Sequence, residues 1–248
     1  MASVSATADR GAWLRLLARW GLLTSLAVAG LMTTFFSAMA TVSSQPGIGG
    51  DHDELLMAAY APGLYRIAMV FDALGWLFMG GLIVIAGLAL RRDASVRGPL
   101  AAALGVTAIT GIIGAFLRLA VVGDLGKQFL ASAGTAEPSI LSLYRSVDLI
   151  IGAQFAAGQL TAGLGLLVVG TAALGVAWVP RTIGWLLVAP GLTSLTLLIG
   201  EVVLDVLLFP VLLLHVVLLA AAGLTLAYTW WRAPSPTVEA ATVEPAPA

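Results

Sequence analysis

Apolar residues fill six long stretches of this chain, and short polar stretches separate them. A helix that crosses a bilayer needs about 20 residues, each adding about 1.5 Å. Six stretches reach that length: Trp20–Val42, Leu64–Leu90, Pro99–Gly123, Val147–Val179, Thr182–Gly200 and Val206–Trp231. They are too long and too evenly apolar for soluble strands, and lipid-embedded helices tolerate the glycines that interrupt them. The pattern predicts an all-α, polytopic transmembrane bundle of six helices over residues 20–231.

The two ends of the chain have a different character. Residues 1–19 combine three arginines with Trp13 and several leucines, which favours a short interfacial helix against anionic lipid headgroups. Residues 232–248 are rich in Pro, Ala and Glu and are predicted to be a disordered tail. A second interpretation stays open, because the arginines, the first apolar run and Ala38-Met39-Ala40 also resemble a cleavable signal peptide. Cleavage would leave five spans.

Basic residues are unevenly divided between the two sides of the predicted bundle. One side carries both termini and eight arginines: Arg10, Arg15, Arg19, Arg91, Arg92, Arg97, Arg181 and Arg232. The other side carries only Arg66, Arg118, Lys127 and Arg145. Because cytoplasmic segments are enriched in Lys and Arg, both termini are expected in the cytoplasm. The larger connections, 43–63 and 124–146, then lie outside.

The composition agrees with a membrane protein and excludes several kinds of functional site. Of the 248 residues, 60% are hydrophobic and only 10% are charged, and the mean hydropathy is +1.01; soluble domains have about a quarter charged residues. The absence of cysteine excludes disulfides, thiolate nucleophiles and cysteine-bound metals. The sequence contains no GxSxG, HExxH or P-loop motif and no basic face for nucleic acid, and it identifies no cofactor. The lipid bilayer is the expected partner, and a multi-pass protein of a bacterial inner membrane is predicted.

Ionisable and amide side chains interrupt the apolar runs in the outer half of the bundle: Asp72, Arg118, Gln154, Gln159 and His215. An ionisable group in the bilayer core costs at least about 2.5–3.5 kcal/mol, so such groups normally pair or line a cavity. Counting helical rise from the outer ends places Arg118 about 8 Å deep and Asp72 about 12 Å deep. These two residues have opposite charge and lie on adjacent spans, so we expect them to pair.

A polar stripe is expected on the fourth span. Asp148, Gly152, Phe155 and Gln159 share one helix face, and Arg145 and Asp148 are spaced to pair locally. His215 follows Pro210 by five residues, and that proline is expected to kink the sixth span. A secondary rim at the outer ends comprises Arg66, Arg145, Asp148, Glu201 and Asp205.

This polar layer supports two interpretations. In the first, an outward-facing pocket lined by Asp72, Arg118, Gln154, Gln159 and His215 binds or transports a small, anionic or lipid-like ligand, or forms part of a proton path. Arg118 would contact an anion, with Asp72 as its counter-ion. In the second, the same groups only fix helix register. The ligand hypothesis expects the Arg118→Gln protein to be expressed but not stabilised by ligand, whereas the structural one expects it not to fold.

Other functions remain open. A non-catalytic accessory or scaffold subunit, with a membrane-protein partner or a second copy of the chain, fits the few chemical groups and short inner connections. An intramembrane enzyme would use His215 with Glu201 or Asp205 as acid–base groups and requires them to converge. The stretch Asp51-His52-Asp53-Glu54 has oxygen and imidazole ligands for a divalent cation, but a solvated acidic loop is the favoured interpretation.

Two short stretches resemble a known family. Leu64-Tyr65-Arg66-Ile67-Ala68-Met69-Val70-Phe71-Asp72 and Val179-Pro180-Arg181-Thr182-Ile183-Gly184-Trp185-Leu186, the latter followed by Ala189-Pro190-Gly191, are similar to motifs of the bacterial six-span membrane proteins catalogued as domain of unknown function 4386. The resemblance covers roughly residues 20–231, and Pro190 departs from the plainer residue expected there. It implies six spans and an inner turn at Arg181, and it implies no activity, because the family has none assigned.

Overall fold

The computed structural model describes residues 2–44, 53–132, 138–204 and 209–231, and these form helices and connections with no strand. The elements are α1 (Ala2–Ser43), α2 (Asp53–Tyr60), α3 (Pro62–Leu90), α4 (Arg97–Ile109), α5 (Gly111–Leu117), the π-helix η1 (Arg118–Val122), α6 (Gly123–Ala131), α7 (Pro138–Leu174), α8 (Arg181–Val203) and α9 (Phe209–Trp231). Six helical stretches are long and apolar enough to cross a membrane. The predicted all-α bundle with six spans is therefore confirmed.

The third spanning stretch is interrupted. Residues 97–131 are apolar enough to span as a unit, but α4 ends at Ile109, α5 is short, and η1 widens the helix from Arg118. A π-helical turn inside an α-helix is rare and is often found at functional sites. In this chain the π-helical turn begins at Arg118, which the sequence analysis predicted to lie in the polar layer.

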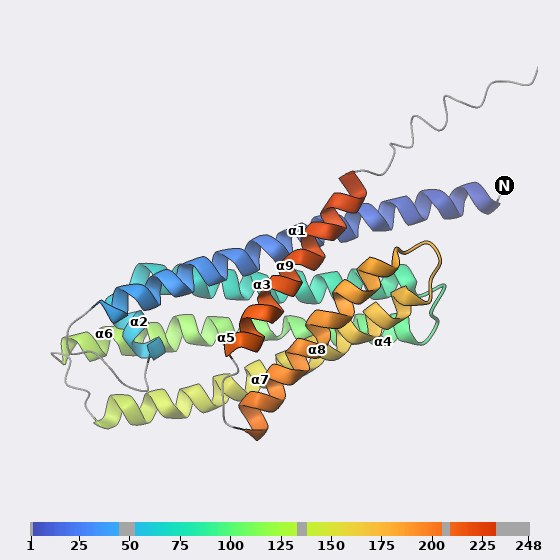
Figure 1. Cartoon of the computed structure of the whole chain (residues 1–248). Coiled ribbons are helices and arrows are strands. Elements are labelled where there is room, and N and C mark those ends of the chain that lie inside the picture. Colours follow the sequence, from blue (N-terminus) through green and yellow to red (C-terminus); the bar gives the residue numbers. More distant parts are fainter. Residues whose placement is uncertain (1, 45–52, 133–137, 205–208, 232–248) are drawn as a thin grey trace, which may run out of the picture.

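The spanning helices form a closed ring. Helix α1 contacts α3, α3 contacts α4, α4 contacts α7, α7 contacts α8, α8 contacts α9, and α9 returns to α1. The first and last helices are therefore neighbours (Figure 1). The start of α1 and the end of α9 lie at the same end of the bundle, while α2 and α6 lie at the opposite end (Figure 1).

Glycines allow close backbone approach at several contacts of this ring. A Cβ on Gly80 of α3 would lie 2.8 Å from the Gly105 carbonyl oxygen of α4, and one on Gly170 of α7 would lie 2.8 Å from that of Gly184 of α8. A Cβ on Gly223 of α9 would collide with the Gly21 backbone of α1. Membrane helices associate through such small-residue packing, because lipid provides little hydrophobic drive between helices.

Several predicted boundaries need correction. Helix α1 runs unbroken from Ala2 to Ser43, so residues 2–19 belong to the same helix as the first span, which begins at Gly11, and do not form a separate helix. The predicted outer connections are largely helical, since they contain α2, most of α6 and the start of α7. Pro210 is the second residue of α9, where no internal N–H is required, so it does not kink the sixth span. The predicted disordered tail lies outside the described residues.

Candidate functional site

A cavity of about 280 Å³ lies at the end of the bundle that carries α2 and α6. Most of its wall is apolar, and the polar groups are few. The lining residues come from α1, α2, α3, η1, α7, α8 and α9: Phe35, Asp53, Glu54, Met57, Met69, Arg118, Phe155, Gln159, Leu197 and Leu212. Of the five residues predicted to line a pocket, the structure brings Arg118 and Gln159 to this wall.

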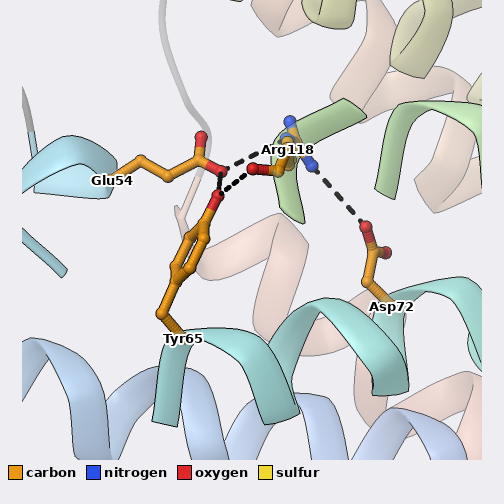
Figure 2. Close-up of polar contacts among 4 residues, drawn as sticks. All are labelled: Glu54, Tyr65, Asp72 and Arg118. Carbon is orange, nitrogen blue, oxygen red and sulfur yellow. Dashed lines mark hydrogen bonds and ion pairs between the residues drawn. The ribbon is translucent and has the colours of Figure 1, made fainter. Parts of the chain in front are cut away.

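Arg118 lies between two carboxylates (Figure 2). Its Nη1 is 3.6 Å from Oδ2 of Asp72, and its Nε is 3.5 Å from Oε1 of Glu54. The predicted pairing of Asp72 with Arg118 is confirmed. Both contacts are longer than the roughly 2.7–2.9 Å of a strong charge-assisted hydrogen bond. Asp72 Oδ2 and Arg118 Nε are buried without a hydrogen-bond partner among the described residues.

Tyr65 fixes the position of Glu54. Its hydroxyl oxygen lies 2.9 Å from Oε1 of Glu54 and 3.1 Å from the Arg118 carbonyl oxygen, so its single proton is shared between two acceptors (Figure 2). The Tyr65 side chain is almost fully buried. The Arg118 carbonyl is the first of η1 and also accepts the Gly123 N–H. The π-helical turn thus leaves this carbonyl within reach of a side chain from α3.

Helix α2 delivers Glu54 to this site. Its residues 55–59 are all buried, which explains why an eight-residue segment holds a fixed place on the bundle. Asp53 and Glu54 occupy its first turn, where the helix dipole favours negative charge. The sequence grouped Glu54 with a possible cation-binding or solvated acidic stretch and did not place it beside Arg118, because an acidic run of this kind is typical of a solvated loop. The available signal was the apolar Leu55–Ala59 segment directly after it.

Gly126 of α6 is where α2 docks. A Cβ at this position would lie 2.8 Å from the Ala58 carbonyl carbon and 2.9 Å from the Ala59 nitrogen, and backbone atoms cannot rotate away. Gly126→Ala is therefore expected to push α2 outward and to destabilise the protein by about 1–3 kcal/mol, measured as thermal unfolding in detergent. Gly123→Ala is the matched control, because a Cβ there meets nothing within 4 Å. Equal stability of the two variants would contradict this docking.

Aromatic rings pack against the Arg118 side chain. The Arg118 guanidinium carbon lies 5.5 Å from the centre of the Phe155 ring, within cation–π range. Phe155 in turn contacts Trp76 edge-to-face, with ring centres 5.7 Å apart. A Cβ on Gly158 would lie 2.9 Å from the Trp76 ring, and one on Gly111 would collide with that ring. Trp76 therefore fills the space left by two glycines and supports the stack.

The two glutamines join helices in different ways. Gln154 Nε2 donates to the Thr110 carbonyl oxygen at 2.9 Å, at the break between α4 and α5, and it is not on the cavity wall. Gln159 lines the cavity, and its Oε1 lies 2.5 Å from Oγ of Ser194 on α8. Ser194 was not predicted. Its hydroxyl is buried and also lies 3.0 Å from the Gln159 carbonyl oxygen.

His215 does not reach the cavity wall, which corrects the prediction. Its Nδ1 lies 2.9 Å from Oγ1 of Thr193 and 3.1 Å from the Pro190 carbonyl oxygen, so it links α9 to α8. Pro190 lies inside α8 and offers no N–H to the preceding turn. The proline that contacts His215 is Pro190 of the neighbouring helix, and not the Pro210 that the sequence associated with this histidine.

The three rim residues whose side chains the structure describes are not part of the site. Arg66, Arg145 and Asp148 are exposed, and no ion pair joins Arg145 to Asp148 within the described part of the chain. Asp148 is exposed and Gly152 faces open space, while Phe155 and Gln159 further along α7 line the cavity. The predicted stripe is thus correct only in its second half. The reason is that α8 runs alongside only the later part of α7 (Figure 1).

Two further predictions concern residues or side chains outside the described part of the chain. Asp205 and the Glu201 side chain lie outside the described residues, so the acid–base pairing with His215 stays a prediction. Asp51 and His52 also lie outside them. Within residues 53–132 and the other described ranges, no group of three potential metal ligands occurs.

The comparisons with known proteins add no relative. No protein-family model matches the chain, and no curated protein or solved structure is significantly similar to it. The resemblance to the domain of unknown function 4386 family therefore stays a prediction.

Proposed function

We propose that this multi-pass membrane protein binds a small or lipid-like ligand in the cavity at the α2 end of the bundle, or transports it. The observation that carries this proposal is the cavity of about 280 Å³, whose mostly apolar wall holds a few polar groups at one place. Ligand sites are typically apolar pockets of about 300–1,000 Å³ with a small number of well-placed polar groups. The volume lies near the lower end of that range and suits a small molecule or part of a lipid.

We further propose that the cavity opens outward from a bacterial inner membrane. Both ends of the bundle's chain lie on one side (Figure 1), and that side carries Arg91, Arg92, Arg97 and Arg181 in its connections and helix starts. The positive-inside tendency supports a cytoplasmic location for it.

Single cysteines test this orientation, because the natural chain has none. Lys127→Cys, at an exposed position of α6, is expected to react with a membrane-impermeant maleimide on intact cells. Ser95→Cys, in the exposed α3–α4 connection, is expected to react only after permeabilisation. The opposite labelling pattern would reverse the proposed orientation.

Blocking the cavity tests ligand binding. The probes are three benzyl compounds of similar size: benzyltrimethylammonium, benzyl alcohol and benzylphosphonate. At least one is expected to bind the purified full-length protein in calorimetry and to raise its unfolding temperature; a ligand at 100 times its Kd stabilises by about 2.7 kcal/mol. Leu212→Trp places a large ring in the cavity wall and should abolish binding.

Leu214→Trp is the control, because this residue lies two positions further along α9 and is half exposed on the outside. It should leave probe binding unchanged. Failure of every probe to bind would count against a ligand site. If the protein then also purified in mild detergent with a second membrane protein, the accessory-subunit alternative would be supported instead.

A further inference from the structure

The cavity contains more negative than positive charge. Asp53 and Glu54 contribute carboxylates to its wall, and Arg118 contributes the guanidinium. A third carboxylate, Asp72, faces the same guanidinium from the other side (Figure 2). An incoming ligand therefore meets a net negative field, although the arginine alone suggested an anion site.

Arg118 is enclosed by groups that keep an anion away. Glu54 lies 3.5 Å from its Nε, Asp72 lies 3.6 Å from its Nη1, and the Phe155 ring lies against the guanidinium. An anion that reached the guanidinium would approach the two carboxylates as well, and juxtaposed like charges cost several kcal/mol. Other basic residues at this end do not compensate, because Arg66, Lys127 and Arg145 are exposed and do not line the cavity.

Among the described residues, Glu54 uses the same carboxylate oxygen for its hydrogen bond and its ion pair. Its contacts with Tyr65 and Arg118, within the described residues, both use Oε1 (Figure 2). Asp53, one residue earlier, is exposed and lines the cavity at the same helix end. The two carboxylates thus sit together where α2 begins, which gives a positively charged group a defined place to bind.

The apolar part of the wall suits an organic molecule. Phe35 and Phe155 contribute rings, and Met57 and Met69 contribute flexible, polarisable side chains. Aromatic faces attract cations, and methionine adapts to apolar groups of varied shape. The wall therefore favours a ligand with an apolar body over an inorganic ion.

We infer that the cavity selects small amphipathic organic cations, with Asp53 and Glu54 contacting the cationic group and the aromatic and methionine wall contacting the apolar body. This inference rests on the ligand-binding function proposed above and names its ligand class. Arg118 then acts as a positioning residue, which holds Glu54 at the cavity edge together with Tyr65.

Calorimetry with the three benzyl probes on the full-length protein tests the charge preference. Benzyltrimethylammonium is expected to bind about tenfold or more tightly than benzyl alcohol, because a carboxylate within about 5 Å is worth at least that in a partly buried site. Benzylphosphonate is expected to bind most weakly. Raising the salt concentration should weaken the binding of benzyltrimethylammonium more than the binding of benzyl alcohol, because salt screens the charge interaction.

Two variants locate the cationic group. Asp53→Asn and Glu54→Gln are each expected to weaken benzyltrimethylammonium binding about tenfold, while benzyl alcohol binding stays the same. Asp124→Asn is the matched control: its side chain is at the same end of the bundle, is exposed and does not line the cavity. Because Glu54 also helps to hold α2, the exposed Asp53 provides the variant that does not depend on folding.

The outcomes separate this inference from the proposed function. Equal affinity for the three probes, or a preference for benzylphosphonate, would overturn the selection of cations and leave ligand binding in place. Unchanged cation affinity in both carboxylate variants would overturn the assigned contacts. Absence of binding by every probe would overturn both the inference and the function on which it rests.

Discussion

Arg118→Gln is expected to lower the stability of the protein by about 3–5 kcal/mol, the usual cost of removing one partner from a buried ion pair. Without the guanidinium, Glu54 and Asp72 would be left in a largely buried place with no opposite charge between them. Glu54 would also lose the group that draws α2 toward η1. Thermal unfolding in detergent, followed by tryptophan fluorescence, measures the loss.

Two comparisons make the result specific to the ion pair. Arg145→Gln changes an exposed arginine at the same end of the bundle and should alter stability by no more than about 0.5 kcal/mol. The triple variant Glu54→Gln, Asp72→Asn, Arg118→Gln should recover much of the lost stability, because neutral partners carry no uncompensated charge. If Arg118→Gln were as stable as Arg145→Gln, the ion pair would not hold the structure, and a direct role for Arg118 at the ligand would be favoured.

Substitution of Gly223 is expected to separate the first helix from the last. A Cβ at this position would collide with the Gly21 carbonyl oxygen and the Ser25 hydroxyl, and the Gly21 carbonyl carbon would be 2.8 Å away. Gly223→Ala should cost about 1–3 kcal/mol, and Gly223→Leu should prevent the contact altogether. The hydrogen bond from Ser25 Oγ to the Ala220 carbonyl, 2.9 Å long, would be lost with it.

The control variant is expected to change the stability in the opposite direction. Gly75 lies inside α3, and a Cβ there meets nothing within 4 Å, so Gly75→Ala should stabilise the protein by up to about 1 kcal/mol through helix propensity. Unfolding temperatures of Gly223→Ala and Gly75→Ala should therefore move in opposite directions. A Gly223→Ala protein at least as stable as the natural one would show that α1 and α9 do not pack at this point.

The spans could be predicted from the sequence because their signal is long and uniform. About twenty apolar residues in a row have few other structures available to them. The ring order could not be predicted, because the glycines that mark contacts, such as Gly80 and Gly170, are indistinguishable in the sequence from glycines like Gly75 that face open space. Which small residue meets which helix is decided by the whole packing.

Only part of the candidate site could be predicted, and the difference again lies in how much depends on the packing of the whole bundle. Asp72 and Arg118 could be paired because isolated charges of opposite sign in neighbouring spans have few other partners. Glu54 could not be placed, since it follows a polar connection and its position depends on the docking of α2 over Gly126. His215 was assigned to the pocket on depth alone, and depth does not specify which way a helix face turns.

The closure of the ring by α1 and α9 has a consequence for biogenesis. Ser25 and its acceptor at Ala220 are 195 positions apart, so at about 5–20 residues per second a ribosome needs roughly 10–40 s between making the two. Throughout that interval the face of α1 that carries Gly21 and Ser25 lies in lipid or beside the insertion machinery, without the helix that later covers it. The ring of helices can therefore close only after α9 has been made.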